Sequence, residues 1–241
     1  MRLDHRKNSD LRPITLEMNV NRYAEGSALI KYGHTHVLCT ASVELTVPKW
    51  LQNSGKGWVT ADYGMLPRST HDRMNREKAA NSGRTMEISR LISRSLRSAV
   101  DLYKMPDKQI SIDCDVLQAD GGTRTAAITG AFVALAQSLH FLVQKNELKE
   151  MPLKHFVSAV SVGIINGEPL LDLAYNEDSV AETDANFVMT SDNHFVEIQG
   201  TAEEKPFTSQ QLHNMIELAT QGCQHLFATQ RAALKTIHFE G

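Results

Sequence analysis

Residues 126–143 are apolar on nearly every face of the helix that they would form. A helix of this kind is suited to the interior of a protein, because no side of it favours contact with water. We therefore expect a helix buried inside the domain, with the other elements packed around it.

The segments around this helix show two different hydrophobic periods. Alternating or branched runs predict strands, and spacings of three and four predict an amphipathic helix at residues 85–102. Thr208 and Gln211 form a capping-box pattern that begins a last helix, at about residues 209–235. Residues 46–68 are interrupted by proline and glycine and are assigned no element. The predicted strands are residues 14–20, 26–32, 37–44, 110–117, 157–165, 170–174, 185–190 and 194–200.

The order of these elements is strands, helix, strand, helix, strands, helix. This order predicts an α+β fold, an α/β-type sandwich with mixed sheets and βαβα halves. No linker rich in proline, glycine or serine divides the sequence, so we expect one domain spanning residues 1–241.

The overall charge gives no argument for nucleic-acid binding, because 25 Lys and Arg face 28 Asp and Glu, a net charge of −3. Any contact with RNA or DNA must come from a local patch. The three cysteines are widely spaced and form no metal-binding pattern. The start of the chain is polar, and no apolar run approaches the roughly 20 residues of a membrane span. We therefore expect a cytoplasmic protein with no membrane contact.

The stretch DCDVLQADGGTRTA, residues 113–126, is typical of an anion site. A predicted strand ends, two glycines follow, and the buried helix begins. Glycines let backbone N–H groups approach an anion closely, and a helix N-terminus supplies unpaired N–H donors. Thr123 adds a hydroxyl and Arg124 a planar fork suited to phosphate. The alternative is a plain turn between a strand and a helix.

Residues 68–97 are rich in arginine. They contain eight bases and three acids, an excess of +5, which is a local charge that a phosphate backbone would attract. Arg90, Arg94 and Arg97 share one helix face by their spacing. That face could equally be a solvated surface or a subunit contact.

Five acidic residues crowd into residues 172–186, and carboxylate oxygens are the natural ligands of Mg²⁺. A plain acidic loop is the alternative. Asp113 and Asp115 face the same side of one predicted strand and could share this cavity. The five are Asp172, Glu177, Asp178, Glu182 and Asp184.

Taken together, the motifs resemble the ribonuclease PH family of tRNA nucleotidyltransferases. The matching segments occur in the family's order and cover nearly the whole chain. They are AEGSALIKYGHTHVLCTAS, WVTADYGMLPRST, GRTMEISRLISRSLRSAVDL, DCDVLQADGGTRTAAITGA and LLDLAYNEDSVAETDANFVMT. The segment between Arg76 and Arg84 looks a residue or two shorter than in some members, which affects loop contacts more than chemistry.

The resemblance implies an enzyme that trims the 3′ ends of tRNA precursors and other RNA. It would use inorganic phosphate and release nucleoside diphosphates in a reversible transfer. The family's phosphate motifs fall on Arg84 and on Gly122, Thr123 and Arg124. Its aspartates for Mg²⁺ (or Mn²⁺) and catalysis fall on Asp178 and Asp184.

The arginines that the resemblance links to tRNA are Arg68, Arg73 and Arg76. It also implies a homohexamer built as a trimer of dimers. Two other functions fit parts of the pattern: a catalytically silent, RNA-binding ring subunit of an exonuclease assembly, and a hydrolytic nuclease. The phosphate arginines and the acidic pair are all present, which argues against the first. The phosphate motif argues against the second.

Overall fold

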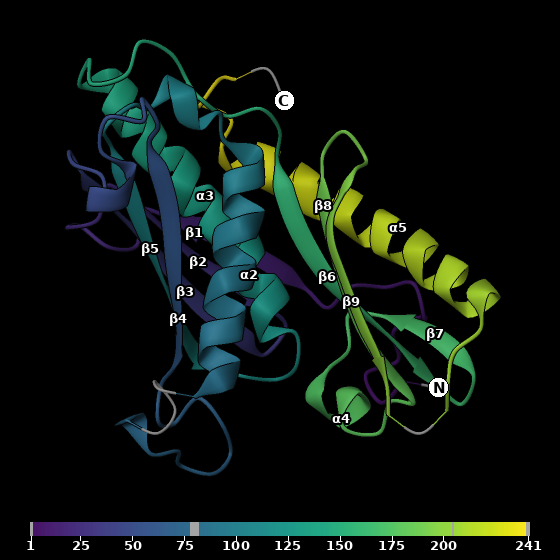
Figure 1. Ribbon diagram of the computed structural model, residues 1–241. Helices are drawn as coiled ribbons and strands as arrows, with labels where there is room; N and C mark the ends of the chain where they lie inside the picture. The colour runs from purple at the N-terminus through teal and green to yellow at the C-terminus, as the bar shows by residue number, and fades with distance from the viewer. Residues whose placement is uncertain (1, 78–81, 204, 240–241) are drawn as a thin grey trace.

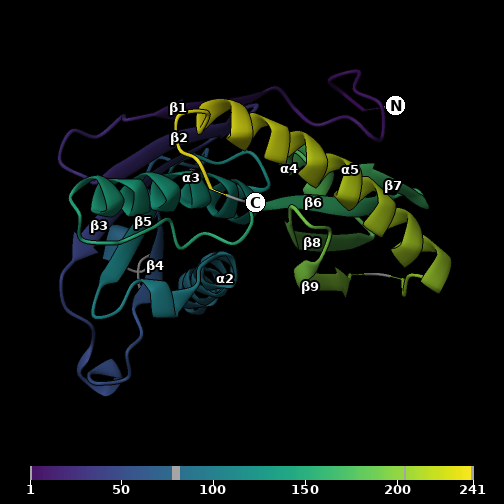
Figure 2. The same cartoon turned by 90° about the horizontal axis from the view of Figure 1, so that it is seen from above.

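The computed structural model describes residues 2–77, 82–203 and 205–239. Two sheets lie on either side of a pair of helices, and a long C-terminal helix lies along the second sheet (Figures 1 and 2). The predicted α/β fold is therefore confirmed. The prediction of a single domain stays a prediction, although one hydrophobic cluster contains residues of both sheets.

The first sheet has five strands in the order β1-β2-β3-β5-β4. The pairs β1–β2, β2–β3 and β3–β5 are antiparallel, and only β4 and β5 run parallel. The carboxyl ends of β4 and β5 therefore lie side by side at the same end of the sheet, and the loops that follow both strands begin there. The strands are β1 (Ile14–Met18), β2 (Gly26–Tyr32), β3 (Thr35–Glu44), β4 (Trp58–Met65) and β5 (Gln109–Gln118).

The second sheet is antiparallel, in the order β7-β6-β8-β9. Its central strand β6 is buried along almost its whole length, because α3 packs on one face and α5 on the other. The Asn166-Gly167 turn between β6 and β7 has positive φ at both residues, as a tight hairpin requires. The strands are β6 (Val157–Ile165), β7 (Glu168–Leu171), β8 (Thr183–Thr190) and β9 (Phe195–Ala202).

The three helices predicted from the sequence are present in the structure. α2 (Gly83–Ala99) and α3 (Thr123–Gln144) lie between the sheets, and α5 (Ser209–Ala233) begins with the predicted capping box of Thr208 and Gln211. A one-turn helix, α4 (Tyr175–Asp178), follows β7. Two short 3₁₀ turns span Lys49–Leu51 and Leu102–Lys104.

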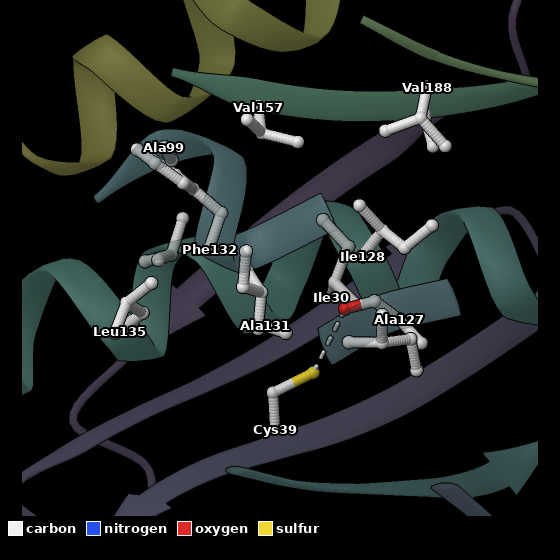
Figure 3. Close-up of a cluster of buried hydrophobic side chains, with 14 of the residues drawn as sticks. Ile30, Cys39, Ala99, Ala127, Ile128, Ala131, Phe132, Leu135, Val157 and Val188 are labelled. Atoms are coloured by element: carbon white, nitrogen blue, oxygen red, sulfur yellow. Dashed lines mark hydrogen bonds between the residues drawn. The ribbon is translucent and has the colours of Figure 1, made fainter. Parts of the chain in front are cut away.

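α3 is the helix that the apolar run predicts, and nearly all of it is buried. Figure 3 shows its apolar side chains, among them Ile128 and Phe132, between Ile30 of β2 and Val157 of β6. By length and mean hydropathy (1.7), α3 is a candidate membrane span. However, 83% of that stretch is buried inside the protein, as expected for a core helix.

The outer edge of β4 is closed by polar side chains of α2. Ser93 and Ser89 accept the N–H groups of Ala61 and Tyr63 at 2.8 and 3.0 Å, and the Arg97 guanidinium donates to the Val59 carbonyl at 2.9 Å. Residues four apart on α2 thus form hydrogen bonds with residues two apart on β4. The sequence prediction missed β4 because proline and glycine dominate the residues around it.

Candidate active site

A cleft of about 610 Å³ opens beside the carboxyl ends of β4 and β5. It is bounded by the loop after β4, the beginning of α3, α4 and β8. Both halves of the chain therefore contribute to one cavity. Its lining includes most of the residues that the sequence pattern singled out, namely Arg73, Arg84, Gly122, Thr123, Arg124, Asp178 and Asp184.

The turn before α3 has the geometry of an anion cradle. Gly121 and Gly122 have φ values of +72° and +65°, which favour glycine over other residues. Added carbon at Gly121 would lie 2.5 Å from the Leu173 carbonyl oxygen. Gly122 is the N-cap of α3 and, as a glycine, brings no side-chain acceptor to the N–H groups of the first turn. Unpaired N–H donors and the positive end of the helix dipole therefore face the cleft.

The Thr123 hydroxyl is held at the entrance of α3 by Tyr63 of β4, with 2.8 Å between the two oxygens. Burial raises the pKa of Tyr63, so its hydroxyl keeps its proton at neutral pH. This hydrogen bond fixes the rotamer of Thr123 and links β4 to the cradle.

Arg124 is mostly buried and is oriented from the second sheet. Its Nη1 donates to Gln199 Oε1 at 2.6 Å and to Glu87 Oε1 at 3.4 Å. Gln199 in turn donates to Glu87 at 2.9 Å, and this hydrogen bond, with the nearby arginines, lowers the pKa of Glu87. A carboxylate and an amide thus hold one end of the Arg124 fork, while the side chain lines the cleft.

Arg84 lies in the first turn of α2 and is exposed at the opposite wall of the cleft. Arg73 also lines the cleft, from the loop after β4. Arg68 and Arg76 do not line it. Arg68 donates to the His71 carbonyl at 2.9 Å, and the charge of Arg76 acts on Asp115. Residues 78–81, within the segment between Arg76 and Arg84, lie outside the described residues.

The helical arginines do not form a phosphate-binding face with the cleft. Arg97 stacks over the Trp58 ring at 4.4 Å, and Arg94 pairs with Glu197 at 2.9 Å. Both therefore have structural partners, and the alternative of an ordinary protein surface holds for them.

Asp178 at the end of α4 and Asp184 in β8 form the acidic side of the cleft. Burial raises the pKa of both carboxyls, and the negative charge of Asp178 raises that of Asp184 further. The charges of Arg84 and Arg124 act on both aspartates in the opposite direction. The phosphate cradle and the acidic pair are thus close enough to influence each other.

The other acidic residues of this segment are engaged elsewhere. Asp172 and Glu177 are buried partners of Arg12 and Arg2, and Glu182 accepts the Gly167 N–H group at 3.2 Å. Asp113 and Asp115 lie on the exposed side of β5 and do not line the cleft, against the sequence expectation. On β4 the register partner of Asp113 is Asp62, and that of Asp115 is Gly64. Of the five acidic residues of this segment, only Asp178 and Asp184 line the cleft.

The pair fits a divalent cation that shares its coordination with a substrate. Within the described residues, no group of three His, Cys, Asp or Glu side chains converges as a complete metal site. Mg²⁺ commonly takes one or two carboxylates and completes its shell with water and substrate phosphate oxygens. The exposed Asp178 and the partly buried Asp184, whose charges repel each other, supply this donor set, and a cation would relieve the repulsion.

Sequence reasoning missed two residues that line the cleft, Asp120 and Tyr175, and two that hold Arg124 from behind, Glu87 and Gln199. Asp120 accepts the Tyr175 N–H group at 3.2 Å, and Tyr175 stands 65% exposed in the cleft wall. Glu87 lies three residues after Arg84, so helix spacing alone could have placed it on the same face. No local signal marks Gln199, because it comes from a strand far away in the sequence.

Comparison with known proteins identifies the family. Residues 10–139 match the model of the 3′ exoribonuclease family, domain 1, and residues 155–222 match that of domain 2. A ribonuclease PH from Bdellovibrio bacteriovorus is 56% identical over 238 residues, covering 99% of this chain and 98% of the relative. The chain belongs to the 3′ exoribonuclease family that includes ribonuclease PH.

Solved structures share this fold. The Archaeoglobus fulgidus exosome with RNA bound to the active site superposes with a TM-score of 0.80 at 22% identity, covering 93% of this chain and 91% of that chain. Rice (Oryza sativa) Rrp46 gives 0.78 at 21%, covering 97% and 100%. At these identities the likeness concerns the fold.

Proposed function

We propose that this protein is a phosphate-dependent 3′→5′ exoribonuclease, a tRNA nucleotidyltransferase that releases nucleoside diphosphates. One observation carries the proposal: a single cleft unites the N-terminus of α3, the guanidinium groups of Arg84 and Arg124, and a pair of carboxylates. The family membership and the 56% identical ribonuclease PH support the same activity.

In this reaction inorganic phosphate is a reactant. It would lie at the beginning of α3, where Gly122 and Thr123 offer backbone and hydroxyl donors and Arg84 and Arg124 offer guanidinium groups. One of its oxygens attacks the last phosphodiester phosphorus of the RNA, and the bond to the preceding 3′ oxygen breaks. The two arginines stabilise negative charge on the reacting oxygens. The leaving 3′ oxygen gains the proton that the attacking phosphate loses, so protons balance and the reaction is reversible.

Asp178 and Asp184 would hold Mg²⁺ or Mn²⁺. Such a cation supplies charge stabilisation at the reacting phosphorus and orients the substrate oxygens. In the protein itself, the charges of Arg84 and Arg124 favour the ionised form of both carboxylates and oppose the burial that raises their pKa. We therefore assign both aspartates to metal binding in preference to proton transfer.

We also propose the remaining expectations of the resemblance. Arg68, Arg73 and Arg76 would bind the body of a tRNA precursor, and the position of Arg73 in the cleft wall supports a path from that loop to the reacting end. The subunits would assemble into a homohexamer, a trimer of dimers, in the cytoplasm. Light scattering with the purified protein tests the assembly.

The activity is tested by incubating RNA and Mg²⁺ with and without phosphate and identifying the released nucleotides. Diphosphates that appear only with phosphate are the expected result. Release of monophosphates would mean hydrolysis, and RNA binding with no product would mean a silent ring subunit. Either result would refute the proposal.

A further inference from the structure

The N-terminal segment, residues 2–13, passes beside α4 and β7 and delivers three arginines to the acidic segment (Figure 1). Arg2 and Arg12 are only 5% and 4% exposed. Charged groups this deeply buried require matched partners. Specific ion pairs therefore hold this segment in place, although its sequence shows only that it is polar.

Arg12 is fully matched to Asp172. Its Nε donates to Asp172 Oδ2 at 3.0 Å and its Nη2 to Oδ1 at 2.7 Å, while its backbone N–H donates to Oδ2 at 2.8 Å. Asp172 is 1% exposed and has a φ of +55°. Burial opposes the charge of Arg12, but the contacts with Asp172 outweigh it and raise the pKa of the guanidinium.

The same guanidinium also reaches the turn before the phosphate cradle. Its Nη1 donates to the Asp120 carbonyl, and its Nη2 donates to the Gly121 carbonyl at 3.4 Å. Thr35 supports the turn from β3, because its hydroxyl donates to the Gly121 carbonyl at 2.6 Å and accepts the Asp120 N–H group at 2.9 Å. Both carbonyl groups before Gly122 are thereby fixed in direction.

Asp172 lies two residues before the N-cap of α4, the helix that ends at Asp178. One planar group therefore joins the chain that leads to the acidic pair with the chain that forms the phosphate cradle. Catalytic groups require placement to within about 0.5 Å, and residues behind them usually supply it.

We propose that Arg12 is a positioning residue for the reaction, which sets the phosphate cradle relative to the acidic pair by bridging Asp172 and the Asp120–Gly121 turn. This inference rests on the proposed function. It assigns to Arg12 no contact with phosphate or RNA.

Arg2 provides a matched control. It is equally buried, and its Nε and Nη2 both lie 2.7 Å from the Glu177 carboxylate. It donates further to the Leu171 and Asp172 carbonyls at 2.8 and 2.9 Å. These contacts hold the chain around α4 but not the turn before the cradle. A loss of stability without a cradle effect is thus expected when Arg2 is changed.

The test compares Arg12→Lys with Arg2→Lys. A lysine keeps a positive charge, but one ammonium group cannot bridge Asp172 and two carbonyls of another segment. For each variant, kcat and the KM for phosphate and for RNA are measured. The rise in melting temperature on adding inorganic phosphate alone provides a readout independent of activity.

For Arg12→Lys we expect the KM for phosphate to rise about tenfold or more, with the KM for RNA changed less than about twofold. The stabilisation by phosphate should shrink in parallel. For Arg2→Lys we expect a lower melting temperature with the KM for phosphate nearly unchanged. A folded Arg12→Lys protein with a normal KM for phosphate would overturn the inference. So would a rise in this KM that is equal in both variants. If the unaltered protein released no diphosphates, the proposed function would be refuted. If it released them and Arg12→Lys kept a normal KM for phosphate, only the positioning role of Arg12 would be refuted.

Discussion

Replacing Gly121 with alanine should damage both the stability and the phosphate site, and Gly55 provides the control. Both glycines have similar left-handed backbones, with φ of +72° and +69°. A Cβ at Gly121 would lie 2.5 Å from the Leu173 carbonyl oxygen, whereas one at Gly55 meets nothing within 4 Å. Ordinary contact begins at 3.4 Å, so about 0.9 Å of separation is missing at Gly121.

The left-handed backbone costs alanine about 1–2 kcal/mol at either site. Alanine also restricts the unfolded chain, which stabilises the variant by about 0.4–1 kcal/mol. Gly55→Ala should therefore lose about 0.5–1 kcal/mol. At Gly121 the backbone of residues 173–175 must also move, which adds about 1–3 kcal/mol as for other overpacked sites. A shift of this size beside the cradle should lower phosphate-dependent turnover about tenfold to a hundredfold.

Urea unfolding measures the free energy of both variants, and release of diphosphates from a short oligonucleotide measures the turnover. Equal unfolding free energies in the two variants would refute the steric argument. Normal turnover in a destabilised Gly121→Ala protein would refute the link between this turn and phosphate.

Four further outcomes are expected. Arg124→Ala should lower phosphate-dependent turnover about a thousandfold with the fold intact by circular dichroism, and near-normal activity at low phosphate would contradict the cradle. Asp184→Asn should abolish turnover yet raise the stability by about 1 kcal/mol, because it removes a buried charge repelled by Asp178; a lower melting temperature would contradict this. Since the pKa of both aspartates is raised in the fold, their contribution to stability is present below the ordinary value of 3.8 and is lost as the pH rises through the raised values. Their ionised form binds the cation, so the acid limb of the pH–rate profile should lie above pH 3.8 and move lower with more Mg²⁺; a limb that ignores Mg²⁺ would count against metal binding. Ser93→Ala should cost about 1–3 kcal/mol, because it leaves the Ala61 N–H group unpaired, and an unchanged urea midpoint would contradict this.

The sequence was sufficient for features that local pattern determines. The uniform apolarity of α3, the apolar and branched runs of β2 and β6 and the capping box at Thr208 each appear in the structure at nearly the expected residues. The cradle could also be predicted, because two glycines between a strand and a helix permit the left-handed backbone that lets N–H groups approach an anion. The convergence of Arg84, Arg124, Asp178 and Asp184 in one cleft was expected from family resemblance, since their separations along the chain carry no geometric signal.

Features determined by partners distant in sequence could not be predicted. β4 is a strand because α2 and β5 complete its hydrogen bonds, which outweighs the proline and glycine around it. Charge counting treated Asp172 and Glu177 as metal candidates. Only the fold shows that two N-terminal arginines neutralise them.

The closed edge of β4 has a consequence for how subunits meet. An open strand edge is a template on which a second chain can add a strand, and natural sheets usually protect it. At β4 the Ser89, Ser93 and Arg97 side chains already satisfy the outward N–H and carbonyl groups of Tyr63, Ala61 and Val59. The sheet therefore cannot be extended from one molecule to the next along this edge without first displacing α2. Any ring of these subunits must close through other surfaces, and the wall of the cleft nearest β4 stays free of a neighbouring strand.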